Sequence, residues 1–267
     1  MPLPAMSMLD EQTAAFYRRA MEALTAAGAP YLVGGAYAFE RYTGIARHTK
    51  DFDIFVRVED CDRVLGVLAG LGCRTERTFP HWLAKAHHGD LFIDVIYSAG
   101  SGIAVVDEEW FEHAEEGVVL GVPALLIPAE EMIWSKAFVQ ERERFDGADV
   151  MHLLHCRAAK MDWKRLARRF GPDWRVLLSH LVIFGFVYPH LRDAVPARLL
   201  EALTARLRRE GGTEPHRDAI CRGTLLSRAQ YLVDVNEWGY KDVRLEPRVA
   251  MSEEDIAHWT RAIDEIP

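Results

Sequence analysis

The chain lacks any apolar stretch long enough to cross a membrane. Hydrophobic residues make up 49% of its 267 residues, but no uninterrupted run reaches the roughly 18 residues that indicate a membrane span. The most apolar segment, residues 176–188, is shorter than that and contains His180. The first ten residues have no basic stretch followed by an apolar core, so no secretory signal is predicted. We therefore expect no membrane partner and a cytoplasmic location.

Cysteine is scarce and scattered. The sequence has four cysteines, and no two of them are separated by the two residues that are typical of metal-binding or redox pairs. This spacing argues against a structural zinc site and against a disulfide framework. We expect buried, reduced thiols at Cys61, Cys73, Cys156 and Cys221.

Positive charge is in the minority, because the formal net charge is −8. An acidic total disfavours a protein that coats nucleic acid without sequence preference. The charge is uneven, however, and basic side chains gather in residues 157–175, where the only acids are Asp162 and Asp173. This stretch leaves open a local site for a polyanion.

The spacing of apolar residues predicts an α+β protein in which a mixed sheet flanked by helices is followed by a helical region. Helices are expected first at residues 11–27, 36–42 and 61–71, with strands at 31–33, 51–57, 91–97 and 118–127, and a loop before the strand at 91. The pattern becomes helical from Pro128 onward. We expect three segments, at residues 1–127, 128–212 and 213–267.

Two carboxylates separated by one residue, Asp51 and Asp53, follow a Gly34-Gly35 pair at a short distance. In a strand, alternate side chains share a face, so both carboxylates project the same way, about 6.5 to 7 Å apart. Such a pair can hold Mg²⁺, which also takes substrate phosphates as ligands. Each element alone has an ordinary alternative, because a Gly-Gly pair is often only a turn and Asp-x-Asp is often a solvated strand face.

A third carboxylate, Asp94, interrupts the apolar run of residues 91–97. An unpaired buried charge is costly, so Asp94 needs a partner. A metal ion shared with Asp51 and Asp53 would supply one.

These pieces together resemble the nucleotidyltransferase fold of the DNA polymerase β superfamily over roughly residues 10–155. Among its members, the chain looks most like the AbiEii-like and MenT-like bacterial nucleotidyltransferases. The resemblance is carried by three motifs, Leu32-Val33-Gly34-Gly35, Arg47-x-Thr49-x-Asp51-Phe52-Asp53-Ile54 and Phe92-Ile93-Asp94-Val95.

The resemblance implies a role for each motif. Gly34 and Gly35 would hold the triphosphate and Thr49 would lie beside the nucleotide. Asp51 and Asp53 would bind Mg²⁺, with Mn²⁺ as a substitute, and Asp94 would complete the metal site or act as a base. The implied substrate is a nucleoside triphosphate such as ATP.

The toxin-type relatives also have a lysine on one helix and a basic link that ends in an aspartate. Here Lys136 is followed by residues 142–149. The match implies that Lys136 neutralises the triphosphate, that Arg142 or Arg144 binds it bidentately, and that Asp149 orients Lys136. The alternative is structural, with Asp146 capping the second helix and Asp149 favouring its first turn.

The predicted activity is transfer of a nucleoside monophosphate from a nucleoside triphosphate to an acceptor hydroxyl, with release of pyrophosphate. The basic stretch at residues 157–175 makes an RNA end, such as that of tRNA, one candidate acceptor. A small molecule such as an antibiotic, or a protein hydroxyl, is the alternative. A toxin of this type would have a cognate antitoxin. A non-catalytic module that binds a nucleotide or a partner is the competing class.

The sequence contains further residues suited to binding. We expect the tail, residues 217–267, to fold back across the cleft and to help define the acceptor. His81, His87 and His88 could line an acceptor site, although histidines at the surface or in the core are the more common case.

Overall fold

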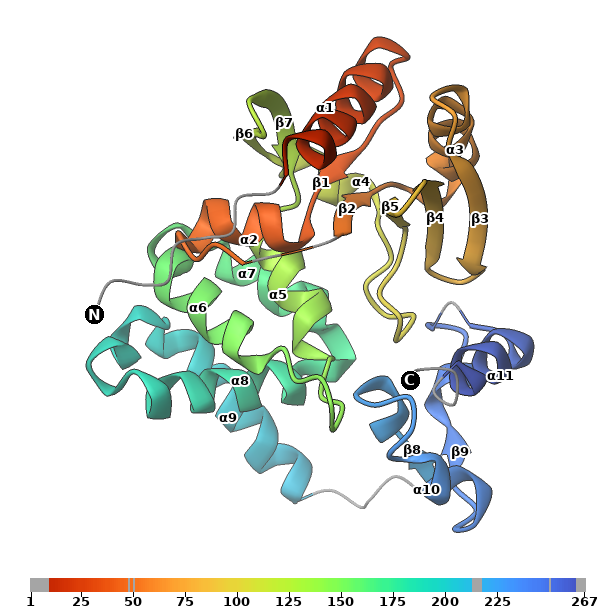
Figure 1. The fold of residues 1–267 in the computed structure, drawn as a ribbon. Helices are drawn as coiled ribbons and strands as arrows, with labels where there is room; N and C mark the ends of the chain where they lie inside the picture. Colours follow the sequence, from red (N-terminus) through yellow and green to blue (C-terminus); the bar gives the residue numbers. More distant parts are fainter. Residues whose placement is uncertain (1–9, 48, 50, 213–217, 250, 263–267) are drawn as a thin grey trace. The chain divides into compact units, whose positions relative to one another are not determined.

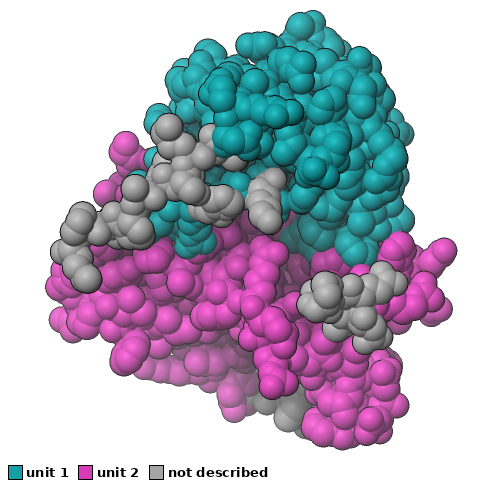
Figure 2. All heavy atoms as spheres, viewed as in Figure 1, with its two compact units in different colours: residues 1–100, 105–128 teal, residues 101–104, 129–267 magenta. Residues whose placement is uncertain are grey.

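The computed structural model describes residues 10–47, 49, 51–212, 218–249 and 251–262. The described parts of residues 1–100 and 105–128 form one compact unit, unit 1, and those of residues 101–104 and 129–267 form a second, unit 2 (Figure 2). The functional division expected at residues 127 and 212 stays a prediction. Residues 213–217, where the third segment was expected to begin, lie outside the described residues.

Unit 1 is built on a mixed sheet with the strand order β3-β4-β5-β2-β1-β7-β6 (Figure 1). The pairs β2–β5 and β1–β7 are parallel, and the other neighbouring pairs are antiparallel. The strands are β1 (Leu32–Val33), β2 (Asp51–Phe55), β3 (Arg74–Phe79), β4 (Leu83–His88), β5 (Leu91–Ile96), β6 (Glu115–Val119) and β7 (Val122–Leu126). The helices are α1 (Glu11–Ala26), α2 (Gly35–Thr43), α3 (Cys61–Gly70) and α4 (Glu108–Glu112), with a 3-10 turn at Val58–Asp60.

The two faces of β2 have different surroundings. Phe52 and Ile54 are buried, and the ring of Tyr17 from α1 stacks on Phe52 with 4.8 Å between ring centroids. Alternation along the strand therefore directs Asp51 and Asp53 to the opposite face. Packing of α1 on the apolar face thus determines which face displays the carboxylates.

The predicted α+β class is confirmed, and the predicted elements at residues 11–27, 36–42, 51–57 and 91–97 correspond to α1, α2, β2 and β5. The expected loop before β5 is wrong, because residues 74–88 form the β3–β4 hairpin. The β3 strand has no buried residue, since it lies at the edge of the sheet. Its polar sequence therefore carries no hydrophobic strand signal.

Unit 2 is helical in its first part and irregular in its tail. The long helices are α5 (Ala129–Ala137), α6 (Gly147–Arg157), α7 (Trp163–Phe170), α8 (Trp174–Val187) and α9 (Ala197–Gly211). The tail contains β8 (Ile220–Cys221), α10 (Leu232–Asn236), β9 (Lys241–Asp242) and α11 (Glu253–Arg261). Short 3-10 turns lie at Ala158–Lys160, Gly171–Asp173, Pro189–Ala194, Gly223–Leu225 and Val243–Leu245.

A buried ion network joins α5 to α7. Arg165 donates from Nη1 to Glu131 Oε2 at 2.5 Å and from Nη2 to Glu130 Oε2 at 2.6 Å. Arg169 Nε donates to Glu131 Oε1 at 3.0 Å. Glu131 is completely buried, and its pKa is raised by that burial, while Arg165 and Arg169 act in the opposite direction.

The network uses two cations of residues 157–175, the stretch that the sequence leaves open as a site for a polyanion. Arg165 and Arg169 turn inward to neutralise glutamates, and Arg175 pairs with Glu210 at 2.8 Å. Three cations of this stretch, Arg165, Arg169 and Arg175, therefore form ion pairs with glutamates of unit 2.

The tail is anchored to the helices of its own unit. Arg248 donates to both carboxylate oxygens of Asp173, at 2.5 and 3.1 Å, and Arg222 approaches Asp173 at 3.5 Å. Ser252 and Asp255 form a capping box at the start of α11. A position of the tail across the cleft stays a prediction.

The helical run Trp163–Val187, which includes α7 and α8, is long and apolar enough to cross a membrane by length and composition alone. It is longer than the apolar segment evident in the sequence because a 3-10 turn joins the two helices. In its most apolar window 44% is buried inside the protein, and the core helix of a soluble protein meets the same criterion.

All four cysteines are free, in agreement with the expectation of reduced thiols. The expectation of burial is correct for Cys61, Cys73 and Cys221 and wrong for Cys156, which is exposed. Cys156 lies near the end of α6, where the helix turns its polar side outward.

Candidate functional site

The three predicted aspartates lie on one face of the sheet in unit 1. In the parallel pairing of β2 with β5, Asp53 is opposite Asp94 and Asp51 is opposite Phe92. Register partners on neighbouring strands point to the same face, about 4.8 Å apart. The fold thus brings Asp51, Asp53 and Asp94 together from β2 and β5, which are neighbours in the sheet although α3, β3 and β4 lie between them in the sequence.

Gly34 and Gly35 connect β1 directly to α2 and lie against this row of carboxylates. The Gly34 N–H donates to the Asp53 carbonyl oxygen at 3.0 Å. A Cβ atom on Gly35, whose φ is +53°, would lie 1.7 Å from Asp53 Oδ2, and one on Gly34 would lie 2.2 Å from Phe55 Cε2. The positive φ of Gly35 favours glycine there, and a side chain at either position would have to push aside the side chain of Asp53 or Phe55 on β2.

The start of α2 offers main-chain N–H groups at the same place. Gly34 occupies the N-cap position and provides no side-chain hydrogen bond to the first turn. The N-terminus of a helix attracts anions through its unsatisfied N–H groups and its dipole. A site for an anion and a carboxylate suited to a cation therefore lie next to each other at Gly35.

The electrostatics of the face are dominated by negative charge. Burial raises the pKa of Tyr37 to about 12, and the charges of Glu40 and Asp53 add to the shift. Burial likewise raises the pKa of Tyr17, with further contributions from Tyr37 and the three aspartates. Both phenols thus stay neutral at physiological pH, Tyr17 on the apolar face of β2, where it stacks on Phe52.

Asp94 has a protein partner that the sequence analysis missed. Lys85 on β4 is its register partner, and Lys85 Nζ donates to Asp94 Oδ1 at 2.7 Å. Burial raises the pKa of Asp94, while the hydrogen bond and the charge of Lys85 act to lower it. The expectation that a metal ion alone would balance Asp94 is therefore corrected.

A periodic signal could have identified this strand. Ala84 and Ala86 are fully buried and alternate with the partly exposed Lys85 and His87. This alternation is typical of a half-buried strand, but alanine is a weak strand former and the pattern does not stand out. Recognising it would have placed Lys85 beside Asp94.

Two carboxylates of the row suit a magnesium ion. Within the described ranges, no group of three or more His, Cys, Asp or Glu side chains is close enough to hold a metal ion. Asp51 and Asp53 nevertheless fit Mg²⁺, which is commonly bound by one or two carboxylates together with water and substrate phosphates. The Asp53 carboxylate lies against the main chain of Gly35, where α2 begins.

Thr49 is used locally. Its hydroxyl accepts a hydrogen bond from Asp51 N–H at 3.2 Å and lies 3.2 Å from the Asp51 carbonyl oxygen, to which it can donate. These contacts stabilise the chain at the start of β2. The contact of Thr49 with a nucleotide stays a prediction.

Lys136 of unit 2 is held between two carboxylates. Its Nζ lies 2.8 Å from Asp149 Oδ2 and 2.9 Å from Asp146 Oδ2. The structural alternative is confirmed in part: Asp146 occupies the N-cap of α6, without a side-chain cap hydrogen bond, and Asp149 lies in the first turn. The predicted role of Asp149, to orient Lys136, requires a direct contact between the two side chains, and this contact is present.

The two predicted arginines differ in their surroundings. Arg142 is exposed over 81% of its side chain and lies 3.9 Å from Glu143. Arg144 Nε donates to Asp146 Oδ1 at 3.3 Å, so that Arg144 joins the lysine cluster. Contacts of Arg142 and Arg144 with a triphosphate stay predictions.

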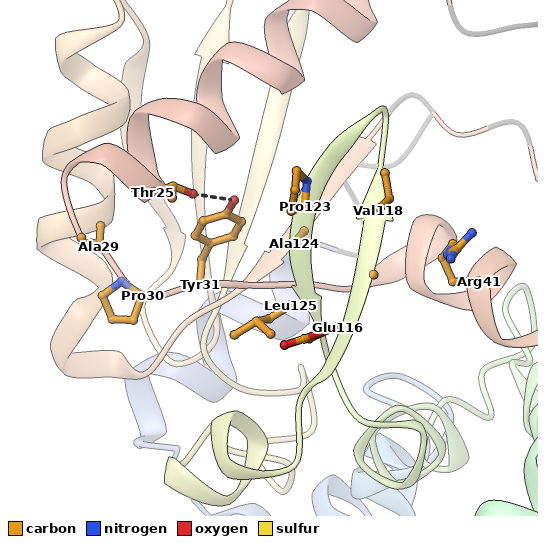
Figure 3. A pocket seen from close by; sticks show the side chains of 12 residues that line it. Thr25, Ala29, Pro30, Tyr31, Arg41, Glu116, Val118, Pro123, Ala124 and Leu125 are labelled. Atoms are coloured by element: carbon orange, nitrogen blue, oxygen red, sulfur yellow. Dashed lines mark hydrogen bonds between the residues drawn. The ribbon is translucent and has the colours of Figure 1, made fainter.

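A cavity of about 860 Å³ lies elsewhere in unit 1. It is lined by the end of α1, the start of β1 and the β6–β7 hairpin, and includes Tyr31, Arg41 and Leu125 (Figure 3). None of Gly34, Gly35 or the three aspartates lines it. This cavity therefore plays no part in the candidate site.

No protein-family model matches the chain, and no curated protein matches its sequence. The fold is similar to that of the antibiotic-resistance factor ANT(2'')-Ia, with 18% identity over 76% of this chain and 95% of that chain and a TM-score of 0.41. A second structure of ANT(2'')-Ia, in complex with adenylyl-2''-tobramycin, has a TM-score of 0.40 at 17% identity over 75% of this chain and 99% of that chain. The lincosamide antibiotic adenylyltransferase LnuA, bound to lincomycin, has a TM-score of 0.38 at 15% identity over 53% of this chain and 95% of that chain. These values are low, so the function of this chain is derived below from its own geometry.

Proposed function

We propose that the carboxylate face of unit 1 is the active site of a metal-dependent nucleotidyltransferase. The enzyme moves a nucleoside monophosphate from a nucleoside triphosphate to an acceptor hydroxyl. The observation that carries this proposal is the contact of Gly35 with Asp53, where a Cβ would lie 1.7 Å from the carboxylate. It brings an N-terminal helix turn, suited to phosphate, against a carboxylate suited to Mg²⁺.

Asp51 and Asp53 are the proposed ligands of the metal ion, Mg²⁺ or Mn²⁺. When bound, the ion would neutralise the phosphate oxygens and stabilise the charge that develops during displacement. Main-chain N–H groups at the start of α2, beginning with that of Gly35, would bind the phosphates. The Gly34 N–H is held by the Asp53 carbonyl oxygen, so Gly34 would shape the turn that presents these groups. The positive φ of Gly35 favours glycine at that position.

In the proposed reaction the acceptor oxygen forms a bond to the α-phosphorus, the bond between the α-phosphorus and its bridging oxygen breaks, and pyrophosphate leaves. The acceptor proton passes to a base. Asp94 is the proposed base, because burial raises its pKa and Lys85 occupies only its Oδ1 atom. A base is most useful when its pKa is close to the working pH.

Lys136, Arg142, Arg144 and Asp149 are proposed to serve the triphosphate from unit 2. An ammonium group has three N–H donors, and Asp146 and Asp149 are the carboxylates within 3 Å of Lys136 Nζ. The third donor is thus proposed to bind a phosphate oxygen. Asp149 would hold Lys136 in position, as its 2.8 Å contact allows.

A small-molecule hydroxyl is the proposed acceptor. The basic stretch that favoured an RNA end is partly used within unit 2, where Arg165 and Arg169 bind Glu130 and Glu131. The net charge of −8 also disfavours a polyanionic acceptor. An RNA or protein acceptor, a toxin role with an antitoxin, and a cytoplasmic location stay predictions from the sequence.

The test is transfer of label from α-labelled nucleoside triphosphates, one base at a time, with Mg²⁺ or Mn²⁺ and a fractionated cell extract. Label should move to the small-molecule fraction. The variant that combines Asp51→Ala with Asp53→Ala should lose about a thousandfold in rate, because several kcal/mol of transition-state stabilisation are removed. Asp90→Ala, an exposed aspartate in the turn between β4 and β5, is the matched control and should transfer at the wild-type rate.

Transfer that survives the double substitution would rule out the proposed site. Label in the RNA or protein fraction would contradict the proposed small-molecule acceptor and support the proposed transfer reaction. Tight nucleotide binding without transfer to any fraction would instead indicate a non-catalytic binding module.

A further inference from the structure

Lys85 belongs to the same row of residues as the proposed metal site. In the antiparallel pairing of β4 with β5 it is opposite Asp94, which in turn is opposite Asp53 on β2. These three side chains therefore lie on one face across three neighbouring strands. Two strand spacings, about 10 Å between Cα atoms, separate Lys85 from Asp53.

The ammonium group of Lys85 is fixed by two contacts. It donates to Asp94 Oδ1 at 2.7 Å, and it lies 4.2 Å from the centre of the Phe92 ring. Lys85 and Asp94 retain only 21% and 14% of their side-chain exposure. A charge-assisted hydrogen bond and a cation–π contact in a half-buried place hold a lysine far more firmly than an exposed ion pair does.

From this geometry we propose that Lys85 is a built-in cation at Asp94, so that the site takes a single divalent ion, at Asp51 and Asp53. This inference rests on the proposed nucleotidyltransferase function and deepens it. Lys85 acts as a positioning residue. It holds Asp94 through Oδ1.

A second divalent ion at Asp94 Oδ1 would have to displace Lys85. An ion bound to Asp94 Oδ1 at the usual distance of about 2.1 Å would lie within about 5 Å of the ammonium nitrogen. Two cations that close repel each other strongly where water is partly excluded. Two-metal sites place their ions about 3.5 to 4 Å apart, and of the three carboxylates of the row Asp94 is the one whose Oδ1 already holds Lys85.

The test counts the bound ions directly. Free Mn²⁺ is measured by electron paramagnetic resonance during titration of the full chain, with and without a nucleoside triphosphate whose α,β-bridge is a methylene group. Wild type should bind one Mn²⁺ per chain. Lys85→Met should bind two, and Lys85→Arg, which keeps the charge, should bind one.

Three further variants make the assignment specific. Lys85→Met combined with Asp94→Asn should return to one ion, because the second ion needs the Asp94 carboxylate. Asp51→Ala combined with Asp53→Ala should bind none. Lys160→Met, at an exposed lysine of a 3-10 turn in unit 2, should behave as wild type.

A thermal readout accompanies the count. Saturating Mn²⁺ should raise the melting temperature of Lys85→Met by more than it raises that of wild type, since two ions stabilise the folded chain more than one. Two ions in wild type, or one in a folded Lys85→Met, would overturn the role of Lys85 and leave the proposed function intact. No bound ion in wild type, with or without the nucleotide, would overturn both.

Discussion

Charged side chains differ in pairing and burial between the sheet of unit 1 and the helices of unit 2. In unit 2, Arg165 and Arg169 meet Glu130 and Glu131 in a core where Glu131 has no exposure. In unit 1, Asp51 and Asp53 are partly exposed on a sheet face, and Asp53 lies against the main chain of Gly35. A high density of charged residues in the sequence therefore does not identify a binding surface. The ion pairs that these residues form in the fold show which of them serve the structure.

The largest expected effect concerns the ion network of unit 2. Arg165→Met leaves Glu130 and Glu131 buried without their main cation, and should lower the free energy of unfolding by about 3–5 kcal/mol. Urea denaturation followed by circular dichroism measures the loss. Catalytic parameters per folded molecule should be unchanged.

A surface pair provides the control for that substitution. Arg175 binds Glu210 with side-chain exposures of 54% and 39%, so Arg175→Met should cost less than about 1 kcal/mol. Equal small losses for both variants would mean that the network is not structural. The basic stretch would then regain its place as a candidate surface for phosphates.

The next prediction concerns the contact of Gly35 with Asp53 in unit 1. Gly35→Ala forces a left-handed backbone conformation on alanine, which costs about 1–2 kcal/mol of stability, and it places a methyl group on Asp53 Oδ2. Affinity for Mn²⁺ should fall about tenfold or more, as for loss of a group that orients a metal ligand. Urea denaturation and Mn²⁺ titration measure the two effects.

Gly44→Ala is the matched control at the other end of α2. Gly44 also has a positive φ, +72°, but among the described residues no atom is recorded within 4 Å of the position of its Cβ. It should show the same loss of stability with unchanged Mn²⁺ affinity. If both variants bind Mn²⁺ equally well, the contact of Gly35 with Asp53 has no bearing on the metal.

The smallest expected effect separates the two readings of Lys136. Loss of one charge-assisted contact to the triphosphate in Lys136→Met should raise the KM for the nucleoside triphosphate about tenfold, or about 1.4 kcal/mol. Asp149→Asn should raise it less, because Asp146 still holds the ammonium group. Lower stability with an unchanged KM would assign the cluster to structure alone.

The sequence predicted those elements in which apolar residues recur at helix or strand spacing and a glycine marks the end. The α1 helix, the passage from β1 into α2, and the strands β2 and β5 have strong local signals, and alternation along β2 places Asp51 and Asp53 on one face. That Asp94 joins them follows from the pairing of β2 with β5. The resemblance to a known fold added roles for these residues. Those roles stay predictions for the tests above.

The rest could not be predicted because it depends on pairing. The β3–β4 hairpin has an edge strand with polar residues and a neighbour rich in alanine, and neither has a strong strand signal. Lys85 was missed with that hairpin, since only the register of β4 with β5 places it at Asp94. The inward direction of Arg165 depends likewise on α5 and α7 packing together, which no local pattern shows.

The central claim is that Asp51 and Asp53, beside Gly34 and Gly35, hold a divalent ion and the phosphates of a nucleotide. Anomalous diffraction from crystals grown with Mn²⁺ and the methylene-bridged nucleoside triphosphate tests it most directly. We predict one Mn²⁺ peak bound by both aspartates, with phosphate oxygens at the main-chain N–H groups where α2 begins. A Mn²⁺ peak elsewhere, or a nucleotide bound away from these glycines, would contradict it.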